Sequence, residues 1–343
     1  MAIELGNFSY ESEPLMPLID SEEKVQTSYG LVKVSIYGDR KKHPIVTFHD
    51  IGLDGDNNFQ SFFQFGTVAE FADKFCVYNI NAPGQEMDAK PFADNYVFPT
   101  MESMPSIIQA VVGHFGFKSF IGFGIGAGAN VMLRYALENQ NKLDALILIN
   151  CSASAAGWVE WGYQKVNINY LRSQKMTNFT VDYLMWHHFG IRQEEGNQDI
   201  MRQYRSYFYN LPNPGNLAAY IESFLNRSAI TFSRDGTTGP KLNIPVLQLV
   251  GSRSAFVDET VDVNAKLDPT KSDWVKIGDC SGLVLDDKPE KATEAILLFL
   301  QGLGYFPSLN VSKIVKRLQS FQQGSMTATT TICDNINEVE AAL

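Results

Sequence analysis

The sequence predicts an α/β protein in which helices cover both faces of a mostly parallel, eight-stranded sheet. Apolar runs typical of buried strands alternate with helical patterns from Gln26 to Asn150. Roughly eighty residues that read mainly as helices follow, before the alternation resumes at Ile244. A helical insertion between two α/β segments predicts a lid over one face of the sheet.

The first predicted elements are strands. The run "LVKVSIYG" (31–38) alternates apolar and polar residues, as a half-buried strand does. The runs "PIVTFHD" (44–50) and "FCVYNINAPG" (75–84) are continuously apolar before they end in polar residues, which is typical of a buried parallel strand. Between these two runs, Phe62 to Phe75 show helical spacing.

Regular alternation of helices and strands follows. The sequence predicts a helix over Glu102 to Phe115 with Pro105 in its first turn, a strand at 120–123, a helix over Ala127 to Glu138 and a strand at 145–150. Beyond the insertion it predicts strands at 244–251 and 273–278, and helices over Glu259 to Leu267 and Pro289 to Gln301.

These patterns divide the chain into four parts. Residues 1–22 form an N-terminal extension, 23–156 and 236–306 form the α/β core, and 157–235 form the helical cap. Residues 307–343 form a mobile C-terminal tail with one short helix expected at 311–321, because "GSMTATTTICDNINEVEAAL" offers too little apolar surface to pack.

Composition argues against several functional classes. A net charge of −10 and a pI near 5.0 disfavour a nucleic-acid partner, which needs clustered Lys and Arg. The cysteines lack metal-ligand or redox spacing, so we expect no zinc site, no disulfide framework and no cofactor. No run resembles a signal peptide or a transmembrane helix, which predicts a cytoplasmic protein and leaves only peripheral contact with membranes open.

The stretch "FIGFGIGAGAN" (120–130) fits two kinds of site. Gly122, Gly124 and Ala127 satisfy the dinucleotide pattern G-x-G-x-x-A. However, the next strand ends in Asn150 instead of the acidic residue that binds a ribose, and at least three strands precede this one, so a nicotinamide or flavin cofactor is disfavoured.

The other reading is the strand-to-helix turn G-x-S-x-G, on which α/β-hydrolases carry their nucleophile. Residues 122–126 fit that turn with Gly124 in the nucleophile position. Counting from the later strands puts Ser254 in the position of the catalytic acid and Gly282 in that of the base. Gly124 cannot act as a nucleophile, Ser254 cannot act as the acid, and Gly282 cannot act as the base. The sequence therefore predicts a protein that is not an enzyme of the usual hydrolase type.

The chain resembles the N-myc downstream-regulated (NDRG) family. The resemblance rests on seven motifs over about residues 23–306, namely "VQTSYGLVKVSIYG", "HDIGLD", "APGQE", "IGFGIGAGAN", "LILIN", "GWVEW" and "NAKLDPT". Members of that family are regarded as non-catalytic α/β-hydrolase-fold proteins. The resemblance therefore implies a cytoplasmic signalling or adaptor protein that binds other proteins in stress response or differentiation, although the family's tail repeats are not evident here.

Two other functions remain open from the sequence. His49 and Asp50 close a strand at its carboxyl edge, where hydrolases build the oxyanion hole, so they and Cys151 are candidates for a residual ligand pocket. Cys151 and His49 could flank the elbow strand at about 10 Å, which permits an atypical thiol hydrolase. The emptied pocket could instead bind an acyl or isoprenoid group, as in a small-ligand sensor.

Weaker signals each have a plainer explanation. Residues 54–58 resemble the start of a calcium loop but lack its Gly and Glu, so a polar turn is expected. His187 and His188 are candidate ligands, yet adjacent helix residues face different sides, so packing in the cap is expected and no metal site is predicted. The Trp158 and Trp161 pair is expected to pack the cap onto the core or to form part of a partner-binding surface. Ser320, three residues after Arg317, is a candidate phosphorylation site.

Overall fold

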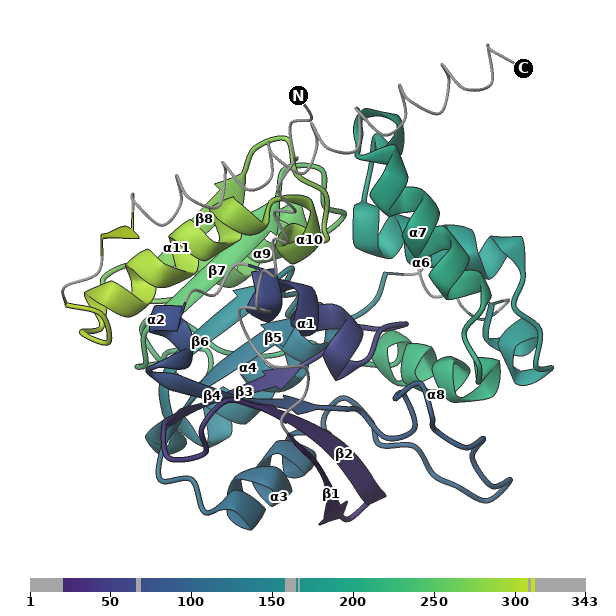
Figure 1. Ribbon diagram of the computed structural model, residues 1–343, viewed down its shortest axis with the longest axis horizontal. Coiled ribbons are helices and arrows are strands. Elements are labelled where there is room, and N and C mark those ends of the chain that lie inside the picture. The colour runs from purple at the N-terminus through teal and green to yellow at the C-terminus, as the bar shows by residue number, and fades with distance from the viewer. Residues whose placement is uncertain (1–20, 66–68, 158–164, 166, 308–309, 312–343) are drawn as a thin grey trace, which may run out of the picture.

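The computed structural model describes residues 21–65, 69–157, 165, 167–307 and 310–311, and an eight-stranded sheet runs through them (Figure 1). The strands lie side by side in the order β1-β2-β4-β3-β5-β6-β7-β8. Their bounds are β1 Ser21–Thr27, β2 Gly30–Tyr37, β3 His43–Phe48, β4 Phe75–Ile80, β5 Phe120–Ile125, β6 Leu143–Ile149, β7 Val246–Gly251 and β8 Ser272–Ile277.

The sheet is parallel from β4 to β8, whereas β1 and β2 pair antiparallel at one edge. The predicted fold class, a mostly parallel eight-stranded sheet, is therefore confirmed. Every residue of the central strands β4, β5 and β7 is buried, as expected for strands covered on both faces. Because the parallel strands point the same way, the loops that follow β3, β5, β6, β7 and β8 meet at one edge of the sheet.

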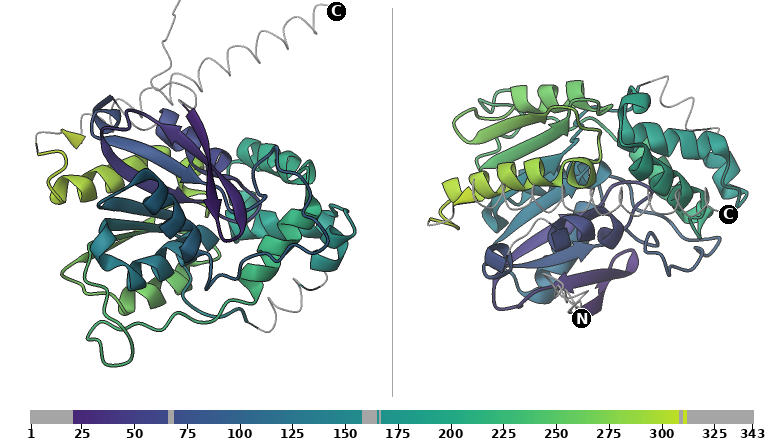
Figure 2. Two further views of the ribbon diagram at one scale, coloured as in Figure 1. Left: turned by 90° about the horizontal axis from the view of Figure 1, so that it is seen from below. Right: turned by 45° about the horizontal axis from the view of Figure 1, so that its top comes forward.

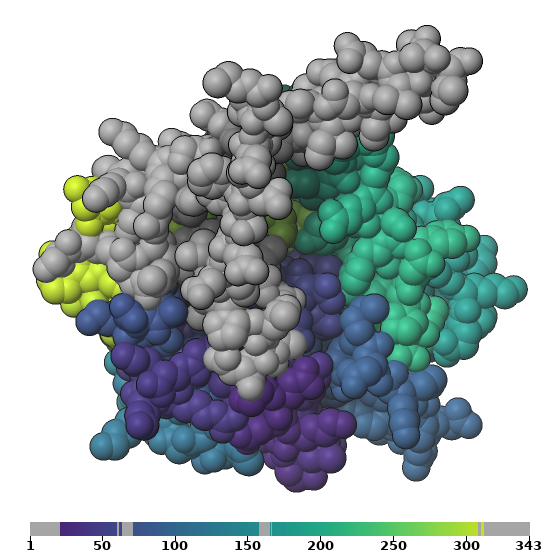
Figure 3. Space-filling view, in the orientation of Figure 1, coloured from purple at the N-terminus to yellow at the C-terminus, as the bar shows by residue number. Residues whose placement is uncertain are grey.

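Helices cover both faces of the sheet and add a flank at one side (Figures 1 and 2). One hydrophobic cluster joins α3, α4 and α9 to the sheet, and a second joins α1, α10 and α11 to the opposite face. The helices α6, α7 and α8 lie between β6 and β7 in the chain and form the teal and green flank in Figure 3. The bounds are α1 Gly55–Phe65, α2 Ala69–Ala72, α3 Pro105–Phe115, α4 Ala127–Glu138, η1 Gln140–Lys142, α6 Asn178–Phe189, η2 Gln193–Glu195, α7 Gln198–Tyr209, α8 Pro214–Leu225, α9 Val257–Ala265, α10 Val284–Asp287 and α11 Pro289–Gly302.

Several predicted elements begin or end elsewhere: α3 begins at Pro105 instead of Glu102, and α9 spans Val257–Ala265 instead of 259–267. The helical spacing read over 62–75 belongs to α1 and α2, and Phe75 opens strand β4. Helix α1 starts at Gly55 because the Asp54 carboxylate accepts a hydrogen bond from the Asn57 amide, as an N-cap residue does. The stretch expected to form a polar turn is therefore the capped start of a helix.

The cap is tied to the core by a buried amide on α8. The Asn216 side chain accepts a hydrogen bond from the Phe92 amide and donates to the carbonyls of Gly84 and Lys90. These bonds fix part of the long irregular segment between β4 and α3, which carries no packing helix of its own. Among the described residues, no helix is long and apolar enough to cross a bilayer.

Helix α4 approaches the sheet so closely that there is no room for a side chain at Gly128 in its first turn. A Cβ atom on Gly128 would lie 2.0 Å from the Phe48 carbonyl oxygen, whereas one on Gly113 of helix α3 would meet nothing within 4 Å. A backbone atom cannot yield as a flexible side chain can, so of these two glycines Gly128 is the one that packing requires.

Gly128→Ala is therefore expected to lower the free energy of unfolding by about 2 kcal/mol or more, because helix and strand must separate. Gly113→Ala is the matched control and should raise it by up to about 1 kcal/mol, since alanine favours a helix interior. Urea denaturation of both variants measures the difference. Equal effects would contradict the close packing of α4 on β3.

Candidate functional site

The sharp turn between β5 and α4 lies at Gly126. Strand β5 ends at Ile125, Gly126 has φ 53° and ψ −115°, and the helix begins at Ala127. The prediction that Gly124 forms this turn is wrong by two positions, because Gly124 belongs to the strand. Its lack of a side chain serves packing instead, since a Cβ atom there would lie 2.6 Å from the Ala129 Cα atom.

The carboxylate of Asp50 fills the space beside Gly126. Its Oδ1 atom accepts hydrogen bonds from the amides of Ile51, at 2.8 Å, and Ala127, at 2.9 Å. A Cβ atom on Gly126 would lie 2.1 Å from this carboxylate. Glycine at the turn therefore does two things: it adopts a backbone conformation that other residues rarely reach, and it leaves room for Asp50.

The other oxygen of Asp50 faces two histidines of the cap. Asp50 Oδ2 lies 2.9 Å from His187 Nε2 and 3.9 Å from His188 Nδ1. All three residues are buried, at 1 to 3% exposed. The expectation that only one of two adjacent helix residues could face this side is wrong, because the carboxylate lies between the two directions and both rings reach it.

The two histidine rings are held by aromatic and backbone neighbours. His188 stacks on Phe208, with ring centroids 5.2 Å apart, and its Nε2 donates to the Ile51 carbonyl oxygen at 2.8 Å. His187 lies edge-on to Phe256 and Phe224. Rings on most sides exclude water, so charges in this cluster interact through a medium of low polarity.

Burial and charge act in opposite directions on these groups. Burial alone would raise the pKa of the Asp50 carboxyl, but attraction and a hydrogen bond from His187, the nearby His188 and the Ala127 amide bring that pKa down to about 2. Burial lowers the pKa of His188 to about 4, and the Asp50 carboxylate offsets only part of this effect. At neutral pH Asp50 is therefore an anion and His188 is neutral.

The other candidate catalytic residues are fully engaged or inert. His49 uses both ring nitrogens, since Nδ1 lies 2.8 Å from the Asp50 carbonyl oxygen and Nε2 accepts from the Ala82 amide. Cys151 is 0% exposed, and burial raises the pKa of its thiol to about 12. A thiol with that pKa carries almost no thiolate at neutral pH.

Ser254 and Gly282 do come together at the same edge of the sheet. Asn150, at the end of β6, bridges them: its side chain accepts from the Ser254 hydroxyl and donates to the Gly282 carbonyl oxygen. The bridge consists of a hydroxyl, a side-chain amide and a backbone carbonyl, all of which are neutral. Ser320 and the Trp158 and Trp161 pair lie outside the described residues.

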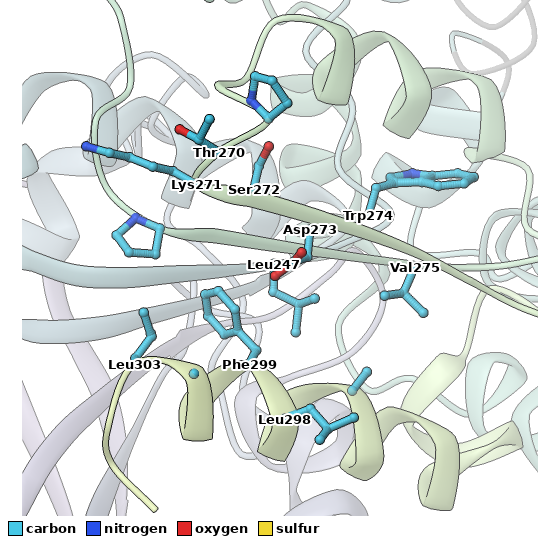
Figure 4. Close-up of a pocket in the computed structure, with 14 residues that line it drawn as sticks. Leu247, Thr270, Lys271, Ser272, Asp273, Trp274, Val275, Leu298, Phe299 and Leu303 are labelled. Carbon is cyan, nitrogen blue, oxygen red and sulfur yellow. The ribbon is translucent and has the colours of Figure 1, made fainter. Parts of the chain in front are cut away.

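Two cavities lie at the opposite edge, near the amino ends of the strands. One is a groove of about 560 Å³ between β8 and α11, lined by residues that include Lys271, Trp274 and Leu298 (Figure 4). The other, of about 810 Å³, is lined by Lys41, Lys118 and neighbouring residues before β3 and β5. Neither cavity is lined by Asp50, His187 or His188.

Sequence reasoning missed the two features that define the site. The position of the turn at Gly126 could have been predicted, because residues 124–128 repeat the same glycine spacing as 122–126. The pairing of Asp50 with His187 could not have been predicted, because 137 positions separate the two residues and no sequence motif links them.

Comparison with known proteins assigns the chain to one family. The family model described as the Ndr family matches residues 22–307. Protein NDRG3 of Xenopus tropicalis is 36% identical over 312 residues, covering 89% of this chain and 78% of that protein. Protein NDRG2 of Bos taurus is 33% identical, covering 95% of this chain and 89% of that protein.

Solved structures of hydrolases share the fold. An esterase from Thermogutta terrifontis aligns with a TM-score of 0.67 at 19% identity, covering 82% of this chain and 99% of its own. An enol-lactonase from Burkholderia xenovorans aligns with a TM-score of 0.63 at 14% identity, covering 81% of this chain and 100% of its own. At these identities the likeness extends to the α/β-hydrolase fold alone.

The Asp50 cluster predicts a large stability difference between two aspartates that each contact a basic side chain of the cap. Asp50→Ala should cost about 3 to 5 kcal/mol of unfolding free energy, because it leaves buried amides and His187 without a partner. Asp182→Ala is the control: Asp182 pairs with Arg205 at 2.7 Å, but its side chain is 60% exposed, so the cost should stay below about 1 kcal/mol. Chemical denaturation measures both, and comparable losses would contradict the role assigned to Asp50.

Proposed function

The chain belongs to the Ndr (NDRG) family, and from that premise we propose that it is a non-enzymatic α/β-hydrolase-fold protein that acts by binding other proteins. We propose further that it works in the cytoplasm as a signalling or adaptor protein in stress response or differentiation. The family resemblance supports these roles. The absence of hydrolase chemistry is supported by the geometry of the site.

The observation that carries the proposal is the position of the Asp50 carboxylate. In α/β-hydrolases the amide that follows the nucleophile and an amide from the loop after β3 bind the negatively charged oxygen of the transition state. The corresponding amides here are those of Ala127 and Ile51, and both donate to Asp50. An anion already bound to these donors would repel a substrate oxyanion instead of stabilising it.

The residues around these amides support the same conclusion. By position in the fold, Gly126 corresponds to the nucleophile, Ser254 to the acid and Gly282 to the base. Glycine supplies neither an attacking atom nor a proton acceptor, and the Ser254 hydroxyl donates to Asn150. Removing a catalytic triad typically lowers the rate by about five or six orders of magnitude.

The two alternative functions have less support. A thiol hydrolase would need Cys151 as thiolate and His49 as base, yet the thiol is buried with a raised pKa and both nitrogens of His49 are engaged. A sensor for an acyl or isoprenoid group would need an open pocket next to Gly126. Asp50 fills that space and its charge disfavours an apolar ligand.

Partner binding is best assigned to the cap. Its helices and the loop after α6 carry large apolar side chains that remain exposed, among them Trp186 at 40%, Ile191 at 52% and Tyr209 at 54%. Exposed aromatic residues of this kind often anchor protein interfaces.

The absence of catalysis predicts that the purified chain hydrolyses activated esters no faster than buffer alone, and that Cys151→Ala leaves that result unchanged. A cysteine-reactive probe should also fail to label Cys151 in the folded protein at neutral pH, because the thiol is buried and protonated. Peptide mapping after labelling measures this, with the denatured chain as the positive control. Ester turnover that disappears in Cys151→Ala would instead establish the thiol hydrolase.

Partner binding through the cap predicts a difference between two exposed apolar residues. Affinity capture from cell extract should recover reproducible partners with the wild type, and Trp186→Ser should reduce their recovery several-fold. The matched control is Leu298→Ser on α11, where the leucine is 51% exposed. This variant should recover the same partners as the wild type. Capture with a chain ending at residue 307 separates binding by the folded part from binding by the tail. Unchanged capture by Trp186→Ser would remove the cap from the proposal.

A further inference from the structure

We propose that Asp50, His187 and His188 form a binding site for a divalent transition-metal ion, with zinc as the ion that fits best. Each residue offers one ligand atom, and these three atoms all lie within 4.8 Å of one another. The site lies between the core and the cap, beside Gly126, and its occupation requires no catalytic activity.

The distances suit a small ion. Zinc binds imidazole nitrogen and carboxylate oxygen at about 2.0 to 2.2 Å in a tetrahedron, which places neighbouring ligand atoms about 3.3 Å apart. In the structure Asp50 Oδ2 lies 2.9 Å from His187 Nε2 and 3.9 Å from His188 Nδ1. Shifts of about half an ångström would bring these two separations to the required value. The third separation, between the two histidine nitrogens, is at most 4.8 Å, so the rings must also approach each other when the ion binds. The ion would take the place of the direct contact between His187 and Asp50.

Hydrogen bonds to the backbone already orient two of the three ligands. His188 Nε2 lies 2.8 Å from the Ile51 carbonyl oxygen, which can only accept, so this nitrogen carries the proton and Nδ1 carries the free electron pair. The amides of Ile51 and Ala127 hold Asp50 Oδ1 and leave Oδ2 toward the histidines. Outer hydrogen bonds of this kind fix ring and carboxylate orientation in metal sites.

The ligand chemistry selects among metals. Two imidazoles and one carboxylate favour zinc and neighbouring transition ions over calcium or magnesium, which prefer oxygen ligands only. The three protein ligands leave a fourth tetrahedral position for water or an anion.

The test measures zinc bound to the full-length protein. Because the site is buried, the chain is expressed in zinc-supplemented medium, and a second sample is loaded with zinc during refolding. After dialysis against a weak chelator, elemental analysis should find about one zinc per chain, and the thermal midpoint should rise relative to the metal-free protein. Cobalt loading should give visible bands of low-coordinate nitrogen and oxygen ligation without the intense band of a cobalt–thiolate bond, which separates this site from the cysteines.

A pair of histidine variants locates the ion. His188→Gln removes a ligand while its amide can still donate to the Ile51 carbonyl oxygen, and it should weaken zinc binding at least tenfold. His114→Gln is the control: His114 faces a single carboxylate, that of Glu23 at 3.0 Å, and its loss should not change the zinc content. Circular dichroism checks that both variants fold. Less than about a tenth of an equivalent of zinc in both wild-type samples, or equal loss in the two variants, would overturn the proposal.

Discussion

The carboxylate of Asp50 joins three parts of the protein that are far apart in the chain. It accepts from the amide that starts helix α4, it closes the loop after β3, and it faces His187 on cap helix α6. A buried charge that loses its partners costs several kcal/mol. The turn, the loop and the cap helix must therefore keep their relative positions, and the geometry of the whole carboxyl edge of the sheet follows from this requirement.

The same interaction engages backbone amides at the carboxyl edge of a hydrolase-like fold. The strained turn at Gly126 and the amides beside it are the features that hydrolases of this fold use to present a nucleophile and to bind an oxyanion. Here an internal anion is held by those amides, and the absent side chain at the turn makes room for it. The amides of Ile51 and Ala127 at this edge are thus hydrogen-bonded within the protein.

The periodicity of the sequence was sufficient to predict a mostly parallel sheet and the order of most helices and strands, but not strand β1 at Ser21–Thr27. Apolar repeats report which face of each element is buried, and that information is local. The register of the glycine-rich turn was mispredicted because residues 120–130 contain two overlapping copies of the same spacing, and strand length decides between them. The cluster of Asp50, His187 and His188 forms through contacts between core and cap. Local sequence patterns carry no information about such contacts, so the cluster could not be predicted.

The bonds made by Asn216 also affect how the boundary between core and cap should be drawn. Phe92 precedes Asn216 by 124 positions, yet the amide of one is bound to the side chain of the other inside the protein. Segments that share buried hydrogen bonds tend to open and close as one cooperative unit. Residues 84–92 therefore belong with α8 in any local unfolding event, although they are connected in sequence to the core.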